Sequence, residues 1–240
     1  MKRVLRRLPG WHSLSLARQL VAGGEPRQNA VARILRPDNL FQPQGTTAYG
    51  RYADELAAAK DALATSTPDI LSFGCSSGEE LLTLRSHFPT ARIRGLDINP
   101  VAVRAARRRV HRAGEDATIS VARAGDASGE PAEAYDLVLA LAVFRHASLN
   151  DAPPRCDGVL DFASFEATVA SLSACVRTGG ILVLRHANFR FGDCAVAVDY
   201  EPVLVGLPSA NESTVTPVYD RSNELVDAAS RDDGLYRKRG

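Results

Sequence analysis

The sequence predicts an α/β fold: a doubly wound, mostly parallel sheet with antiparallel C-terminal strands and an N-terminal helical extension. From Asp69 onward, short apolar segments alternate with segments of helical apolar spacing, which is typical of a parallel sheet covered by crossover helices. After Phe191 short strand-like segments are joined by turns, which indicates antiparallel strands. Before residue 67 the chain is helical or irregular. We therefore expect an N-terminal helical and lid extension over residues 1–66 and the sheet domain over residues 67–240.

The elements follow in order along the chain. Residues 53–64 are rich in Ala, a strong helix former, and come directly before the first strand. Residues 99–114 have clear helix ends, because Asn99 suits the N-cap, Pro100 the first position and Gly114 the end. The pair Gly179-Gly180 is expected to end the helix that begins at Phe162. We expect strands at 69–73, 91–98, 117–125, 135–143 and 181–187, then at 195–206, 215–228 and 234–239, with a hairpin tip at 220–223.

Composition sets limits on the function. Charged residues make up 24% of the chain and the net charge is +1, so no global charge favours nucleic acid. The four cysteines form no C-x-x-C pair, and the sequence shows no metal-ligand set. The basic start lacks an unbroken apolar segment, so we expect no signal peptide, no membrane span and a cytoplasmic location. The five arginines of the 99–114 helix are expected to be mainly solvated.

The loop Gly74-Cys75-Ser76-Ser77-Gly78 joins the first strand to a helix and allows three interpretations. It fits G-x-S-x-G, with Ser76 as the nucleophile of a serine hydrolase, but no convincing acid and histidine follow in the required order. It resembles a dinucleotide-binding loop, but Glu79 and Glu80 would repel a diphosphate. It also suits S-adenosylmethionine, whose sulfonium tolerates acids and whose carboxylate can bind backbone N–H groups.

The other strand ends favour the third interpretation, because ligands of such sheets bind at the carboxyl ends of the strands. Asp97 ends the second strand and is placed to accept hydrogen bonds from both ribose hydroxyls. Asp126 follows the third strand and is our candidate for the adenine amino group. We expect the neighbouring residues Ile98, Ala127, Leu141 and Ala142 to contact the cofactor as well.

The stretch from about Asp69 to Ala187 resembles a class I S-adenosylmethionine-dependent methyltransferase. The segments "FGCSSGEE", "GLDINP", "GDA", "YDLVLALAVFRH" and "VRTGGILVLRHANFRFGD" are similar to the family motifs in order and spacing. The glycine loop is most similar to that of the chemotaxis-receptor methyltransferases. Ser72 and Ser76 depart from the family pattern, which commonly has an acid and a glycine there. The resemblance implies a Rossmann-like methyltransferase fold and S-adenosylmethionine as cofactor.

The candidate catalytic and substrate residues are fewer. His146, after the fourth strand, is the candidate general base, since a histidine titrates near neutral pH. Arg145 is expected beside it, near the reactive methyl group. Asn188 and Arg190 follow the fifth strand and are candidates for substrate binding. Arg51 and Tyr52 belong to the segment "FQPQGTTAYGRY", which also contains Gln42 and Thr46 and forms either a lid over the site or a linker from the helices to the core.

The acceptor stays open at this point. A small molecule or a protein carboxyl or other side chain fits better than nucleic acid, because the charge balance is near zero. The oligomeric state is also open. The alternative to an enzyme is a regulatory protein that binds S-adenosylmethionine or S-adenosylhomocysteine without turnover, and the departures at Ser72 and Ser76 keep that alternative open.

Overall fold

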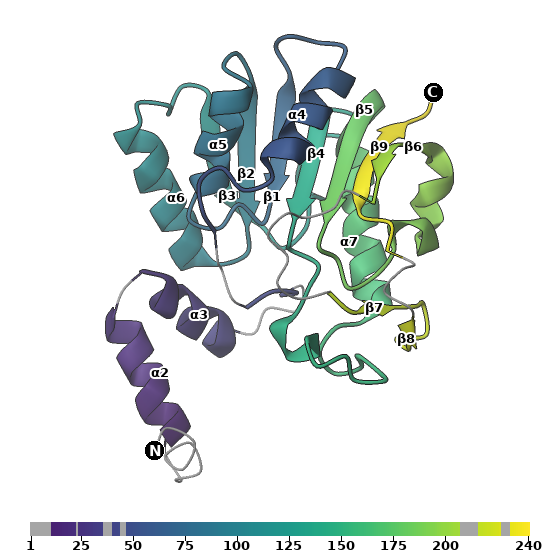
Figure 1. Cartoon of the computed structure of the whole chain (residues 1–240). Coiled ribbons are helices and arrows are strands. Elements are labelled where there is room, and N and C mark those ends of the chain that lie inside the picture. The colour runs from purple at the N-terminus through teal and green to yellow at the C-terminus, as the bar shows by residue number, and fades with distance from the viewer. Residues whose placement is uncertain (1–10, 23, 36–39, 44–46, 207–215, 227–230) are drawn as a thin grey trace.

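A computed structural model describes residues 11–22, 24–35, 40–43, 47–206, 216–226 and 231–240 (Figure 1). One sheet contains seven strands: β1 (Asp69–Phe73), β2 (Arg92–Asp97), β3 (Ile119–Arg123), β4 (Tyr135–Leu141), β5 (Val176–Arg185), β6 (Tyr200–Val205) and β9 (Gly234–Lys238). Their order is β3-β2-β1-β4-β5-β9-β6. The first five run parallel, and β9 pairs antiparallel with both β5 and β6. The predicted fold class is confirmed.

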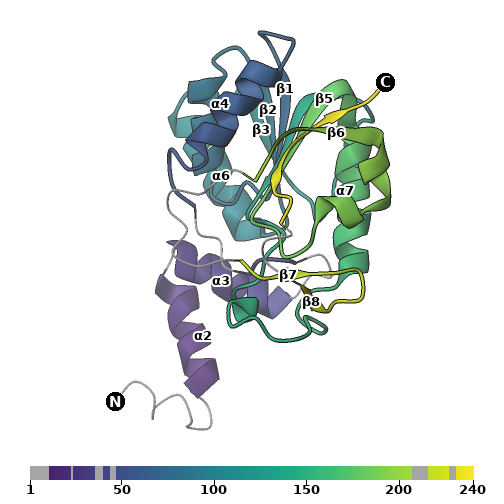
Figure 2. The same cartoon turned by 45° about the vertical axis from the view of Figure 1, so that its right-hand side comes forward.

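Helices cover both faces of the sheet, so the molecule has three layers (Figure 2). One face packs against α4 (Ala53–Ala62), α5 (Glu79–His87) and α6 (Pro100–Arg112), and the other against α7 (Phe162–Cys175). The first core contains Leu56, Leu84 and Val110 from these helices. The second contains Phe165 and Leu172 from α7. Because α4 contributes to the first core, it packs as part of the sheet domain although it precedes residue 67.

The predicted ends of α6 are confirmed. The side-chain oxygen of Asn99 accepts a hydrogen bond from the Val101 N–H at 3.0 Å, and Pro100 is the first helical residue. Gly114 follows with a φ of 73°, which a glycine adopts without strain. Local sequence chemistry thus fixes where this helix starts, and its start lies directly after the end of β2.

The expected end of the helix at Gly179-Gly180 is wrong. Helix α7 ends at Cys175, and β5 begins at Val176 without a loop between them. Val176 pairs with Tyr135 and Ile181 with Leu137, so the extra residues form an irregularity in β5 that contains both glycines. A glycine pair marks a strand bulge as readily as a helix end, and here strand pairing decided between them.

The C-terminal expectations are confirmed in part. Residues Ala195–Asp199 form a 3-10 helix, η3, and the strand expected over 195–206 begins only at Tyr200. The hairpin tip at 220–223 is confirmed, because the Asp220 carboxylate accepts hydrogen bonds from the Ser222 and Glu224 N–H groups. Its strands β7 (Val218–Tyr219) and β8 (Leu225–Val226) form a separate two-stranded sheet. Residues 215, 227 and 228 of that prediction lie outside the described residues.

Two helices, α2 (Trp11–Ala22) and α3 (Gly24–Leu35), precede this domain and lie below the sheet in Figure 1. The side-chain amide of Asn99 donates a hydrogen bond to the Gln28 carbonyl at 2.8 Å, which joins α3 to the start of α6. Within the described ranges, no helix combines the length and apolar character needed to cross a membrane. Thr46 of the predicted lid lies outside the described residues.

A buried ion pair fastens α4 to the sheet. The Arg185 Nε donates a hydrogen bond to Glu55 Oε1 at 2.7 Å, and both side chains are less than 10% exposed. Asp233 approaches the same guanidinium at 3.7 Å. Burial of a charge away from water is unfavourable unless an opposite charge lies beside it. Removal of one member of this pair would therefore leave a buried charge without a counter-charge.

We expect Glu55→Leu to lower the free energy of unfolding by about 3 kcal/mol, because Arg185 loses its main counter-charge in the core. The double variant Glu55→Leu/Arg185→Met should recover most of that loss. Urea unfolding measures both. Asp54→Leu, at an exposed position of the same helix, is the matched control and should cost less than about 1 kcal/mol. A double variant no more stable than Glu55→Leu would contradict this account.

Candidate functional site

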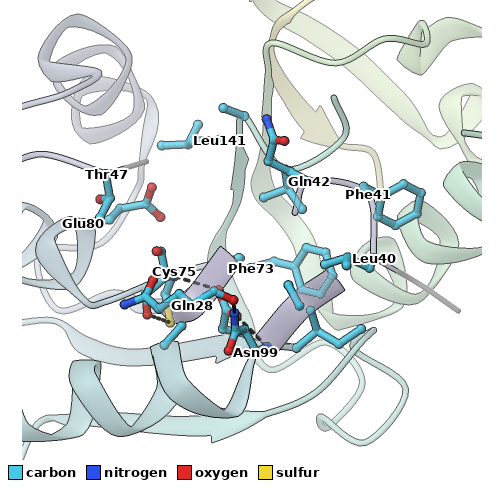
Figure 3. Close-up of a pocket in the computed structure, with 18 of the residues that line it drawn as sticks. Gln28, Leu40, Phe41, Gln42, Thr47, Phe73, Cys75, Glu80, Asn99 and Leu141 are labelled. Carbon is cyan, nitrogen blue, oxygen red and sulfur yellow. Dashed lines mark hydrogen bonds between the residues drawn. The ribbon is translucent and has the colours of Figure 1, made fainter. Parts of the chain in front are cut away.

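A cavity opens at the carboxyl ends of β1, β2, β3 and β4 (Figure 3). It encloses about 950 Å³, a volume that includes space open to solvent. Strand ends and the loops after them supply one wall. The N-terminal segment supplies the other through Gln28, Ala32, Leu40, Phe41, Gln42, Pro43, Thr47, Ala48, Arg51 and Tyr52.

The glycine loop forms the floor of this cavity. The N–H groups of Gly74 and Cys75 both donate to the Leu96 carbonyl, which holds the loop against β2. Gly74 has a φ of 78°, and a Cβ there would collide with the Val143 side chain. Gly78 has a φ of 90°, and its Cβ would lie 3.0 Å from the Ala106 backbone. Both predicted glycines are therefore required, Gly74 lining the cavity and Gly78 packing behind it on α6.

Ser76 lines the cavity in a left-handed conformation, with a φ of 48°. Its N–H donates to Asp97 Oδ2 at 2.8 Å. Its Oγ is buried without a hydrogen-bond partner among the described residues. A serine nucleophile needs a base within hydrogen-bond reach, so the hydrolase interpretation is not supported. A buried hydroxyl at the surface of a cavity is instead available to a ligand.

Asp97 lies beside the loop, as its place after β2 predicts. Its two carboxylate oxygens accept hydrogen bonds from the backbone N–H groups of Ser76 and Asn99, each at 2.8 Å. Burial raises the pKa of this carboxyl, and the two backbone hydrogen bonds oppose that rise. A carboxylate has about four acceptor positions, so Asp97 can still accept hydrogen bonds from hydroxyl groups in the cavity.

Glu80 lines the cavity, whereas its place in the sequence predicted only a charge near the glycine loop. It lies in the first turn of α5 and projects toward the centre of the cavity (Figure 3). Ser72 Oγ donates to its Oε1 at 2.6 Å. Burial raises the pKa of Glu80 to about 7, while Ser72 and Arg51 counteract that rise. Ser72, which departs from the family pattern, thus holds a carboxyl that reaches the cavity from the neighbouring helix.

The predicted lid residues Arg51 and Tyr52 both line the cavity. Arg51 Nη2 donates to the Tyr52 hydroxyl at 2.8 Å, and the guanidinium carbon lies 4.9 Å from the ring centroid. Burial raises the pKa of Tyr52 to about 12, so the hydroxyl keeps its proton at neutral pH. This segment thus brings one cation, Arg51, to a cavity that also contains Glu80 and Asp97.

Several residues around the cavity have a strained backbone. Tyr52, Ser76 and Ala142 all line it with φ values of 63°, 48° and 58°, a region that non-glycine residues rarely adopt. Each such residue costs about 1–3 kcal/mol and persists only where its surroundings enforce it. Their concentration at one cavity supports a binding role for it.

Of the other predicted cofactor contacts, Cys75, Ile98, Leu141 and Ala142 line the cavity, whereas Asp126 and Ala127 do not. Asp126 Oδ1 accepts hydrogen bonds from the N–H and Oγ of Ser128, and these lower the pKa of the carboxyl. Ala127 is buried in the core against α7. Ala124 and Gly125 line the cavity in their place.

The four residues predicted near the acceptor form hydrogen bonds with residues that do not line the cavity. His146 Nδ1 accepts a hydrogen bond from the Ser148 N–H and caps the short helix η1 (Ala147–Leu149). Asn188 is buried, and its amide accepts from the His146 N–H and donates to the Pro217 carbonyl. Arg145 and Arg190 contact Asn150 and Asp193, respectively. None of the four lines the cavity that the described residues form.

The arginines of α6 are mainly solvated, as expected, because four of the five are exposed and only Arg109 is half-buried. Arg107 Nε donates to the Val121 carbonyl at 2.9 Å. Arg109 pairs with Glu79 and donates to the Ser77 carbonyl, so its guanidinium holds the glycine loop through residues that do not line the cavity. A helix-face pattern cannot reveal this contact, because the partner belongs to a loop more than twenty residues earlier.

Comparison with known proteins relates part of this domain to one family model. Residues 71–182 match the family model of a methyltransferase domain. No curated protein sequence matches the chain. The loop type within the family, similar to the chemotaxis-receptor enzymes, stays a prediction.

Solved structures similar to this chain have low sequence identity. A putative sarcosine dimethylglycine methyltransferase from Galdieria sulphuraria is 18% identical, with a TM-score of 0.41, and covers 55% of this chain and 43% of its own. A methyltransferase from Geobacter sulfurreducens in complex with S-adenosylhomocysteine is 18% identical, with a TM-score of 0.38 and coverages of 66% and 51%. The YcgJ protein from Bacillus subtilis is 10% identical, with a TM-score of 0.48 and coverages of 79% and 100%.

The chain spans about half the length of the first two of these structures. The family model, by contrast, matches the segment from β1 to β5 that carries the glycine loop, Asp97 and the end of β4. Residues 71–182 thus match a methyltransferase domain, in agreement with the family that the sequence motifs resemble.

Proposed function

We propose that this protein transfers the methyl group of S-adenosylmethionine to a small molecule or to a protein side chain. The observation that carries the proposal is the charge of the cavity, in which Glu80 and Asp97 face a single lining cation, Arg51, among the described residues. An acidic cavity suits a cofactor with a sulfonium and an ammonium group. It does not suit the phosphates of a dinucleotide or of nucleic acid.

Each polar group of the cavity has a counterpart on the cofactor. Asp97 would accept hydrogen bonds from the ribose hydroxyls, as the resemblance implies. Glu80 would bind the ammonium group, and Arg51 the carboxylate, as a planar guanidinium does well. Ser76 Oγ, buried without a partner among the described residues, would gain a hydrogen bond. Ile98, Ala124 and Leu141 offer apolar contact for the adenine ring.

When bound, S-adenosylmethionine supplies a methyl group on a sulfonium that a nucleophile can attack directly. The chain's own contribution would then be orientation of the acceptor and exclusion of water. A hydroxyl acceptor would also need a base, and the predicted base, His146, would have to reach it from outside the lining of the described cavity.

The regulatory alternative gains no support from this site. It rested on Ser72 and Ser76, which depart from the family pattern. Ser72 Oγ instead positions Glu80, and Ser76 keeps the left-handed backbone that a glycine would adopt. Both departures are thus compatible with a complete cofactor site.

Cofactor binding and methyl transfer can be tested together. Calorimetry should detect S-adenosylmethionine binding that Asp97→Ala weakens by at least about tenfold, because charge-assisted hydrogen bonds to the ribose are lost. Asp126→Ala, whose carboxylate lies outside the cavity, is the matched control and should bind nearly normally. Methyl-labelled cofactor added to size-fractionated cell extract should label one fraction. Cofactor binding without label in any fraction would contradict the transferase proposal.

Affinity for S-adenosylmethionine should depend on pH. Because the pKa of Glu80 is about 7 in the free protein, acidification protonates the carboxyl that would bind the ammonium group. Affinity for S-adenosylmethionine should therefore fall by about tenfold between pH 7 and pH 5.5. Calorimetry of Glu80→Gln should show weaker binding with little pH dependence over this range. An unchanged pH dependence in Glu80→Gln would assign the proton to another group.

The stability of the free protein provides a check with the opposite sign. A raised carboxyl pKa means that the folded state binds the proton more tightly, so stability is lost as pH rises from about 4.5 through 7. Glu80→Gln should consequently unfold at a higher temperature than the natural protein at pH 8, and this difference should shrink at pH 5.

Substitutions of Ser76 test how large a side chain the glycine loop accepts. Ser76→Gly relieves the strained backbone and Ser76→Ala keeps the side chain small, so both should bind the cofactor within about tenfold of the natural protein. Ser76→Leu should abolish binding, because a branched side chain would occupy the cavity. Loss of turnover with intact binding in both small variants would revive the nucleophile interpretation.

A further inference from the structure

Two strained residues face one another beside the cavity. Tyr52 and His186 have φ values of 63° and 54°, and their ring centroids lie 5.5 Å apart. They are separated by more than a hundred residues, since Tyr52 precedes α4 and His186 follows β5. Histidine tolerates the left-handed region better than most residues, whereas tyrosine there is uncommon. Strain at both partners of one contact indicates that their surroundings enforce it.

Tyr52 connects this contact to the cavity. Its hydroxyl accepts a hydrogen bond from Arg51 Nη2 at 2.8 Å, and the Arg51 guanidinium lies over its ring. Arg51 and Tyr52 both line the cavity, whereas His186 lies behind Tyr52 and does not. Its ring contact with Tyr52 therefore connects His186 to the lining of the cavity.

A second contact joins the same two elements. Glu55 lies one helical turn after Tyr52 on α4, and Arg185 directly precedes His186, so the buried Glu55–Arg185 pair lies next to the Tyr52–His186 pair. The His186 N–H also donates to Asp233 Oδ2 at 2.7 Å, which fixes the backbone from its other side. Figure 1 shows α4 in front of the sheet beside β4 and β5. The start of α4 is thus held at two adjacent points.

The surroundings of His186 determine its protonation state. It is buried, and burial together with Arg185, Arg231, Arg145 and Arg51 lowers its pKa to about 3. Its ring is consequently neutral across the physiological pH range. A ring in such surroundings serves as a fixed packing surface.

We propose that His186 is a positioning residue that holds Tyr52, and through it the Arg51 guanidinium, in place for the carboxylate of the cofactor. The inference rests on the proposed function. This role explains why a histidine occupies a strained position surrounded by arginines. Its ring would hold Tyr52, and with it Arg51, the one cation that lines the described cavity.

The test compares two ligands that differ in the carboxylate alone: S-adenosylmethionine and decarboxylated S-adenosylmethionine. The natural protein should prefer the former by about tenfold or more, the effect of one charge-assisted contact. Arg51→Ala should remove that preference. His186→Asn keeps a residue that tolerates left-handed backbone and removes the ring, so the preference should fall below about threefold. Calorimetry gives each dissociation constant.

The design separates positioning from loss of structure. Binding of the decarboxylated ligand should change less than about threefold in His186→Asn, because that ligand makes no use of Arg51. His111→Asn, on the exposed side of α6, is the matched control and should bind both ligands normally. The double variant Arg51→Ala/His186→Asn should lose no more preference than Arg51→Ala, because both changes remove one contact.

Three outcomes would overturn the inference. An unchanged preference in His186→Asn, with Arg51→Ala having lost it, would show that His186 does not position Arg51. Equal weakening of both ligands in His186→Asn would show a merely structural role. A preference retained in Arg51→Ala would place the carboxylate elsewhere. Failure of the natural protein to bind either ligand would instead overturn the proposed function.

Discussion

The site depends on one interaction, in which the Asp97 carboxylate accepts backbone hydrogen bonds from Ser76 and Asn99. Ser76 belongs to the loop after β1, and Asn99 starts the helix after β2. One side chain therefore fixes the distance between two successive crossovers at the point where the cavity opens. Asn99 in turn caps α6, and its side-chain amide donates a hydrogen bond to the Gln28 carbonyl of α3. The N-terminal wall of the cavity is thus connected through Asn99 to the same carboxylate.

Such an arrangement is costly without a ligand. Two carboxyls, Asp97 and Glu80, lie in a confined space where burial raises the pKa of each. Desolvation of a carboxylate is unfavourable unless positive charge or hydrogen bonds compensate. A cationic ligand would provide that compensation. The protein thus gives up some stability in its free form, as is common where a binding site is organised in advance.

Sequence patterns predicted the parts of the molecule that follow local rules. The alternation of strands and helices predicted the sheet, and Asn99, Pro100 and Gly114 predicted the ends of α6. The position of Gly74, Ser76 and Asp97 at strand ends predicted that they lie at the cavity. The failures concern contacts between segments far apart in the chain. Periodicity could not show that Glu80 turns inward to Ser72, that Arg109 braces Ser77, or that β5 begins without a loop after α7, because each depends on tertiary packing.

The buried Glu55–Arg185 pair has a consequence for how the chain folds during synthesis, since its partners lie 130 residues apart. At about 5–20 residues per second, a ribosome needs on the order of 7 to 26 s to make the residues between them. Throughout that interval Glu55 and the apolar face of α4 have neither β5 nor β9 to pack against. The lid residues Arg51 and Tyr52, made early, thus become anchored only after most of the sheet has been translated.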